Sequence, residues 1–129
     1  MSLTAPEILY LHDVALEYGG GAPGIRDVGL VSAAIGRALQ TFDGRPLYAT
    51  PLLEAAACAH AIAHDHPFMD GNKPTGFLVL GLWLKRNGIP WSAAPDDAEH
   101  AFLAVAVGQW QAGDLVAWAA ERVLHPEGT

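Results

Sequence analysis

The chain has few charged residues, and most of those it has are acidic. Only 16% of its 129 residues are charged, and 7 Lys+Arg against 14 Asp+Glu give a formal net charge of −7. Proteins that bind nucleic acid through its phosphates present a basic surface. The composition therefore argues against direct nucleic-acid binding, and it means that any phosphate ligand is held by a few local donors.

Cysteine and long apolar runs are also scarce. Cys58 is the only cysteine, which excludes a disulfide scaffold and fits a reducing compartment. It stands in an Ala-rich run, so we interpret it as a small buried hydrophobic residue. The longest apolar run, 75–84, is shorter than the roughly 18 residues of a membrane span. Since no signal-peptide pattern is evident either, we expect a cytoplasmic protein without a membrane partner.

Apolar and helix-forming residues are abundant. Hydrophobic residues make up 51% of the chain, and frequent Ala with sparse Val, Ile and Thr favours helix over sheet. We predict a single domain, 1–129, with an all-α fold: a bundle of about six helices around a central apolar helix. The expected helices cover about 5–17, 28–39, 51–64, 75–86, 96–107 and 114–124. The fourth is apolar on every side, so we expect it at the centre.

Two of the glycine-containing connections could take part in function. The first, 18–24, lacks the spacing of a nucleotide-binding fingerprint, and we interpret it as a flexible connection. The second, 41–49, places Asp43-Gly44 between aromatic and apolar residues, which predicts a short hairpin or flap.

The residues that carry chemistry lie in one stretch, 66–76, of sequence His-Pro-Phe-Met-Asp-Gly-Asn-Lys-Pro-Thr-Gly. Gly71-Asn72-Lys73 at the start of a helix forms a natural anion site, because free backbone N–H groups and the positive end of the helix dipole point the same way. His66 is a candidate proton acceptor and Asp70 a candidate metal ligand. Each has a structural alternative, such as a helix-end His, a turn-forming Asp, an N-cap Asn or a solvated Lys. Their combination within one turn favours a site that binds phosphate.

This stretch resembles the active-site motif of Fic/Doc proteins, His-Pro-Phe-x-Asp-Gly-Asn-Lys-x-Thr, and in particular the death-on-curing (Doc) toxin branch. The resemblance extends over about residues 7–124. It includes five further segments, Leu11-His12-Asp13, Tyr18-Gly19-Gly20, Pro23-Gly24-Ile25-Arg26-Asp27, Ile35-Gly36-Arg37-Ala38 and Leu82-Trp83-Leu84-Lys85-Arg86-Asn87-Gly88.

The resemblance implies a Fic fold and a nucleotide-dependent transfer onto a protein hydroxyl. In the Doc branch, the terminal phosphate of ATP goes to a Ser/Thr hydroxyl of a protein in the translation machinery, and growth stops. Carried over by position, His66 is the base, Asp70 binds Mg²⁺, and Gly71, Asn72 and Lys73 hold phosphates. The segment 42–49, with Asp43, Gly44 and Arg45 at its tip, is the flap that aligns the target by strand pairing. The self-inhibiting Fic motif is not evident, so we expect inhibition by a separate antitoxin protein.

Two positions depart from the family pattern. Pro74 stands where the pattern has Arg, which removes a guanidinium and a backbone N–H from the anion site. Losing such a charge-assisted phosphate contact costs about 1.5–3 kcal/mol. An attenuated enzyme, or a catalytically inactive module that binds nucleotide or antitoxin, is therefore a second interpretation. Phe77 stands where the AMP-transferring branch has a further Arg, which argues against AMP transfer.

A third interpretation is an HD-type metal phosphohydrolase. His60 and His64 have the i, i+4 spacing of metal ligands on one helix face, and His64-Asp65 resembles the HD doublet. Such a site needs distal ligands, for which His12, His100 and Asp114 are the candidates.

Overall fold

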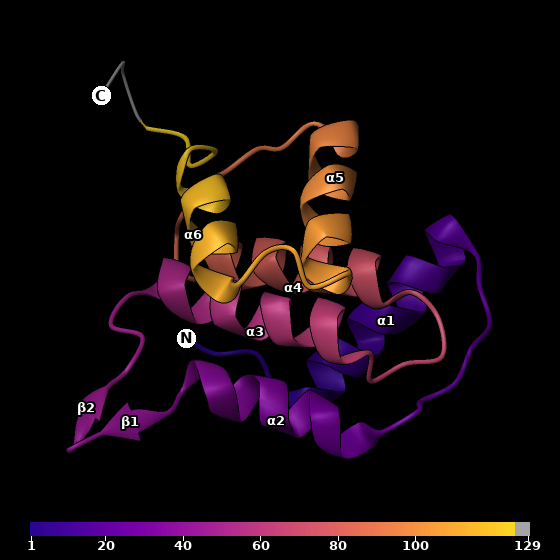
Figure 1. The fold of residues 1–129 in the computed structure, drawn as a ribbon, viewed down its shortest axis with the longest axis horizontal. Helices are drawn as coiled ribbons and strands as arrows, with labels where there is room; N and C mark the ends of the chain where they lie inside the picture. The colour runs from indigo at the N-terminus through magenta and orange to yellow at the C-terminus, as the bar shows by residue number, and fades with distance from the viewer. Residues whose placement is uncertain (126–129) are drawn as a thin grey trace.

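The computed structural model describes residues 1–125, which fold into six helices and one short hairpin (Figure 1). The elements are α1 (Ala5–Gly19), α2 (Val28–Ala38), β1 (Thr41–Phe42), β2 (Arg45–Pro46), α3 (Pro51–Asp65), α4 (Asn72–Arg86), α5 (Pro95–Ala106) and α6 (Ala112–Ala120). The predicted all-α fold is confirmed. Two boundaries differ by three residues or more: α4 begins at Asn72, earlier than predicted, and α6 ends at Ala120, after which Val123 forms a β-bridge with Trp91.

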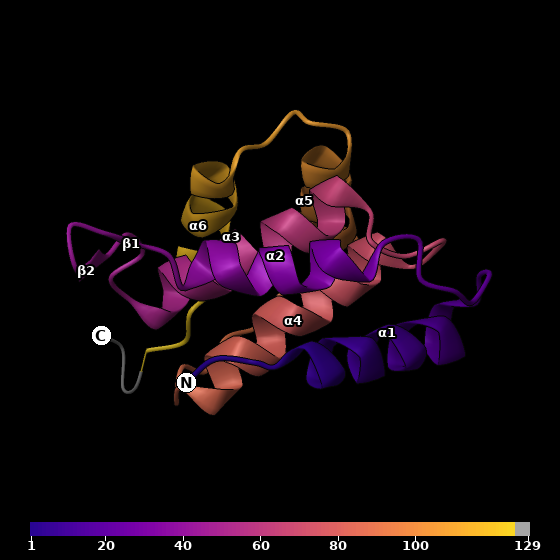
Figure 2. The same cartoon turned by 90° about the horizontal axis from the view of Figure 1, so that it is seen from below.

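Helix α3 occupies the centre of the bundle. Its residues 55–63 are all buried, and it packs against α2, α4, α5 and α6. Figure 2 shows α3 and α4 between α1 on one side and α5 and α6 on the other. Helix α4, which the sequence places at the centre, also lies inside the bundle against α1, α3 and α5, although it leaves part of its apolar surface half-buried. The small alanines of α3 let its neighbours approach closely: a Cβ at Gly76 would lie 3.0 Å from the carbonyl oxygen of Ala59.

Local sequence signals set most helix starts. Thr4 and Glu7 form a capping box at α1, Asp27 caps α2 by accepting from the Gly29 N–H, and Thr50 caps α3 by accepting from the Leu53 N–H. Cys58 is buried within α3, and burial raises the pKa of its thiol to about 12, as expected for a structural residue. Among the helices of residues 1–125, none is both long and apolar enough to cross a membrane.

Candidate functional site

The turn 66–71 joins the C-terminus of α3 to the N-terminus of α4. His66 is the C-cap of α3, is exposed, and has left-handed backbone angles, φ 55° and ψ 63°. Within residues 1–125, it shares a positive φ with only one other non-glycine residue, Asp43. A left-handed residue ends a helix abruptly, and the turn that follows His66 leads within six positions to the positively polarised end of α4 at Asn72.

Phe68 anchors this turn in the core. It is 1% exposed, and its ring stacks on that of His12 with 3.8 Å between centroids and 7° between planes. Asn72 holds the backbone of Phe68 from the other side: its Oδ1 accepts from the Phe68 N–H, and its Nδ2 donates to the Phe68 carbonyl, both at 3.0 Å.

The side chain of Asn72 is therefore committed to the turn. Asn72 is 7% exposed and its amide bonds on both sides to Phe68. We had expected the Asn72 amide to face a phosphate or to cap the helix. In this structure Gly71, with φ 81°, is the N-cap, and only the backbone N–H of Asn72 is left for an anion.

His12 is a site residue that sequence reasoning missed. It is 3% exposed, and its Nε2 lies 2.8 Å from the carbonyl oxygen of Asp70. Because a carbonyl only accepts, the Nε2 atom carries the proton in this contact. His12 thus holds both ends of the segment 68–70. The signal that could have pointed to it was its place in the Leu11-His12-Asp13 segment shared with the family.

The segment Gly20–Asp27, which we call the strap, runs along the turn. The Arg26 and Asp27 N–H groups donate to the Pro67 carbonyl at 2.8 and 3.0 Å, and the Met69 N–H donates to the Gly24 carbonyl at 3.1 Å. Ile25 and Phe68 form an antiparallel β-bridge. Part of the segment 18–24, which the sequence suggests to be a flexible connection, is therefore tied down, because Ala22 and Gly24 bond to residues more than 40 positions further along the chain.

Two side-chain contacts complete the strap. The Ala22 N–H donates to the Asp70 carboxylate at 2.7 Å, and the Arg26 guanidinium donates to the carbonyls of Asp65 and His66. Gly21 is required here, since a Cβ on it would lie 3.0 Å from the Cβ of Asp70.

The N-terminus of α4 carries the candidate anion donors. Asn72 and Lys73 are in the first turn, where helix geometry leaves their N–H groups without intrahelical acceptors, and Lys73 is exposed. Pro74 has no N–H, and the Thr75 N–H already donates to the Gly71 carbonyl at 3.0 Å. Asp70, which is exposed, directly precedes Gly71.

A cavity of about 460 Å³ adjoins this helix end. Its walls come from α4 and α5, with Lys73, Pro74 and Phe77 on one side and Ala98, Glu99 and Phe102 on the other. The room beside the anion donors is therefore mostly apolar, and the Pro74 ring forms part of its wall.

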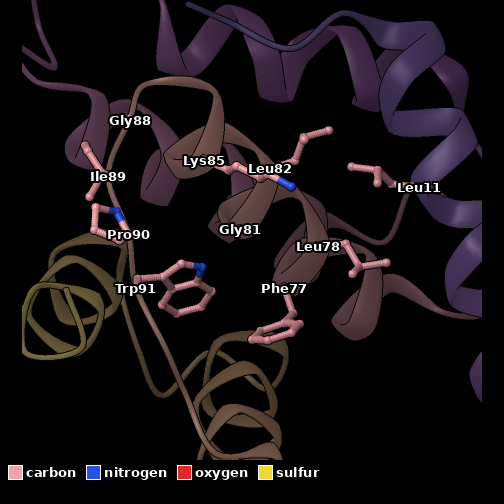
Figure 3. Close-up of a pocket in the computed structure, with 10 residues that line it drawn as sticks. All are labelled: Leu11, Phe77, Leu78, Gly81, Leu82, Lys85, Gly88, Ile89, Pro90 and Trp91. Atoms are coloured by element: carbon pink, nitrogen blue, oxygen red, sulfur yellow. The ribbon is translucent and has the colours of Figure 1, made fainter. Parts of the chain in front are cut away.

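A larger groove of about 790 Å³ lies further along α4 (Figure 3). Leu11 of α1, Phe77 and Leu78 of α4, and Trp91 line it, and Lys85 is the charged residue at its rim. It contains no residue of the turn 66–71, and Phe77 lines both this groove and the cavity of about 460 Å³.

The predicted hairpin forms, but not beside the turn. Asp43 and Gly44 both have positive φ, as a type I′ turn requires, and Phe42 pairs with Arg45. The hairpin precedes the N-terminus of α3, whereas His66 caps its C-terminus, and a 15-residue helix is about 22 Å long (Figure 1). In this structure Asp43, Gly44 and Arg45 therefore lie away from the turn that carries His66, and their role in aligning the target by strand pairing stays a prediction.

The candidate metal ligands do not converge. His60 and His64 stack in parallel at 5.4 Å, and the Nε2 of His60 lies 2.8 Å from the Trp110 carbonyl oxygen. Burial lowers the pKa of His60, which favours the neutral ring. His12 is engaged at the turn, and no group of three or more His, Cys, Asp or Glu side chains that could hold a metal ion is found within residues 1–125. The HD-type interpretation has no structural support here.

Comparisons with known proteins agree with this arrangement. A family model described as the Fic/DOC family matches residues 2–84, which include the whole turn. The protein kinase doc of Escherichia phage P1 is 35% identical over 100 residues, which cover 75% of this chain and 76% of that protein. The toxin Doc of Mycolicibacterium smegmatis is 35% identical over 74 residues, 57% of each chain.

Proposed function

Because the chain belongs to the Fic/DOC family, we propose that it is a Doc-type toxin that transfers a phosphate from ATP to a Ser/Thr hydroxyl of a protein in the translation machinery. The observation that carries this proposal is that the exposed His66 and the N-terminus of α4 belong to one short turn and are six positions apart. A base and an anion site on one short turn are what phosphoryl transfer needs, since catalysis there is mostly positioning and charge stabilisation.

In this proposal His66 accepts the proton of the attacking hydroxyl while the new O–P bond forms and the bond to the ADP oxygen breaks. The backbone N–H groups of Gly71, Asn72 and Lys73, with the Lys73 ammonium, bind the phosphate oxygens. The cavity beside Lys73 offers room for the nucleoside.

Asp70 is the residue that we propose for Mg²⁺. Its exposed carboxylate suits a hard cation, and Mg²⁺ sites often combine one or two carboxylates with substrate phosphates. When bound, the ion neutralises charge on the transferring phosphate. Asp70 keeps its position through the bond that its carboxylate accepts from the Ala22 N–H.

A second candidate function is a weakened or inactive member of the family that binds nucleotide or antitoxin. Pro74 favours it, since it replaces a guanidinium and an N–H at the anion site. AMP transfer is less well supported, because Phe77 is half-buried against Trp91 and Phe102 and contributes no charge. In either case we propose that the protein acts in the cytoplasm and is inhibited by an antitoxin protein.

The transfer reaction is tested by incubating the protein with Mg²⁺, γ-labelled ATP and bacterial lysate. We expect a labelled protein band from wild type and, for His66→Ala, a loss of about 10²- to 10⁴-fold, the range for removing a general base. His64→Ala is the matched control, an exposed histidine two residues away on the same helix end, and should label normally. Wild type without a band, or His66→Ala with an equal one, would contradict the proposal.

Two further experiments distinguish phosphate transfer from AMP transfer and an attenuated enzyme from a fully active one. Label from α-labelled ATP would indicate AMP transfer in place of phosphate transfer. In Pro74→Arg, restoring the family's guanidinium should raise the labelling rate about 10- to 100-fold if the chain is attenuated. An unchanged rate would mean that another group fills that role.

A further inference from the structure

Arg26 lies 40 residues before His66, outside the motif, yet its guanidinium binds the end of α3. We propose that Arg26 is a positioning residue: it fixes the left-handed backbone of His66 and so sets the direction in which the imidazole points. This inference rests on the proposed function, in which the His66 imidazole takes the proton of the attacking hydroxyl.

The contact is made with two adjacent carbonyls. The Nε of Arg26 donates to the His66 carbonyl at 2.6 Å, and its Nη2 donates to the Asp65 carbonyl at 2.7 Å. A guanidinium is planar and presents its N–H groups in a fixed fork, so these two bonds define the relative orientation of the two peptide groups. The positive charge also suits the C-terminal end of a helix, where carbonyls lack intrahelical partners.

The conformation that Arg26 holds is one that a histidine seldom adopts. His66 has φ 55°, in the left-handed region where a Cβ is crowded. Pro67 follows and disfavours the right-handed helical region for residue 66, which leaves extended conformations as the alternative. A change to an extended conformation would turn the carbonyl of His66 away from that of Asp65, and the fork of Arg26 would lose one acceptor.

The backbone of Arg26 also bonds to the turn. Its backbone N–H donates to the Pro67 carbonyl at 2.8 Å, as does that of Asp27 at 3.0 Å. Arg26 therefore binds the residues on both sides of the His66–Pro67 bond, through its side chain and through its backbone. A lysine could not reproduce this, because an ammonium is a point charge on a flexible stem without the planar fork.

The test compares three variants of the full-length protein. Arg26→Ala and Arg26→Lys should each lower kcat about 10- to 100-fold, as expected when a reacting group is misplaced by about an ångström, and leave KM for ATP nearly unchanged. Added guanidinium ion should restore part of the activity of Arg26→Ala. Arg37→Ala is the matched control: its guanidinium lies 3.8 Å from the side chain of the same Asp65, and it should keep its activity within about twofold.

A second readout does not depend on activity. In NMR spectra, we expect two sets of signals to shift in both Arg26 variants: those of the Phe68 backbone amide and those of the His66 imidazole. Both sets should stay in place in Arg37→Ala. If wild type transfers no phosphate, the proposed function fails, while these shifts still decide the role of Arg26.

The inference is overturned if the His66 signals of Arg26→Lys match those of wild type, or if kcat falls only in proportion to the folded fraction measured by thermal unfolding. An Arg26→Ala protein that does not fold leaves Arg26→Lys, with the same two measurements, as the deciding variant.

Discussion

Two connections flank α2, and they contrast sharply. The strap, 20–27, and the hairpin segment, 41–47, are both exposed and both contain glycines with positive φ. The strap bonds to the turn that carries His66, whereas the hairpin pairs residues of its own segment, Thr41 with Pro46 and Phe42 with Arg45. Exposure and composition are thus poor guides to the role of a loop. What distinguishes the strap is a set of partners that lie far from it in the sequence.

The largest effect on stability is expected from two phenylalanines, one that pairs with the strap and one within the hairpin. Phe68, which pairs with Ile25 of the strap, is 1% exposed, and Phe42 of the hairpin is 75% exposed. We expect Phe68→Ala to lower the free energy of unfolding by about 3–5 kcal/mol, because it leaves a cavity beside His12. Phe42→Ala should change it by no more than about 0.5 kcal/mol. Urea denaturation of both variants checks this, and equal losses would break the comparison.

The second prediction separates the effect of backbone strain from that of contact between a new side chain and its neighbours. Gly21 of the strap (φ 118°) and Gly44 of the hairpin (φ 76°) both resist an L side chain, so each Gly→Ala change should cost about 1–2 kcal/mol. A new Cβ at Gly21 meets the Asp70 side chain at 3.0 Å, while one at Gly44 meets nothing within 4 Å.

Only Gly21→Ala should therefore disturb the turn. We expect it to shift the NMR signals of Met69 and Asp70 and to lower phosphate transfer, whereas Gly44→Ala should do neither. If Gly44→Ala folds normally but loses phosphate transfer, the hairpin takes part in the reaction.

The smallest effect concerns a contact that lies outside both regions and depends on pH. The Arg86 guanidinium, with the Thr4 N–H, lowers the pKa of Glu7 from 4.5 to about 2. A lowered pKa means that this contribution is complete above about pH 4.5 and is lost as pH falls toward 2. The Pro67, Gly24, Asp65 and His66 carbonyls that accept the strap's bonds do not titrate in this range.

We therefore expect Glu7→Gln to be less stable than wild type at pH 6 and to approach it at pH 3. Chemical denaturation at the two pH values measures the difference. An equal gap at both would show that the carboxylate charge of Glu7 contributes nothing. The protection factors of the Arg26 and Asp27 amides, which correct for the intrinsic pH dependence of exchange, should be the same at both pH values.

Much of the fold could be predicted because its signals are local. Capping residues, Pro at the first helical turn and apolar periodicity lie within a few positions of the helices that they define, as at Thr4, Asp27 and Thr50. Asp43-Gly44 likewise specified its own turn type. The central position of α3 beside α4 was harder to predict, because its small residues matter only through the neighbours that they allow to approach.

The candidate site divides in the same way. His66, Asp70, Gly71 and Lys73 stand together in the sequence and stay together in the structure, and their roles remain proposals. The part that sequence reasoning missed consists of residues whose meaning depends on a distant partner: His12 beneath Phe68, and Arg26 on the carbonyls of Asp65 and His66. The side-chain amide of Asn72 likewise bonds to a residue outside its own helix, the backbone of Phe68.

By itself, the sequence determined the helices, the hairpin turn and the family motif, because each is encoded by residues within one or two helical turns of each other. Only the tertiary structure decided which loop accompanies the motif. Hydrogen bonds between the strap and the turn join backbone groups, which every residue carries, and so they leave no mark in the side-chain pattern. The packing of α1 and α2 against α4 and α3 brings those groups together, and in this way it holds the strap against His66 and leaves the hairpin at the far end of α3.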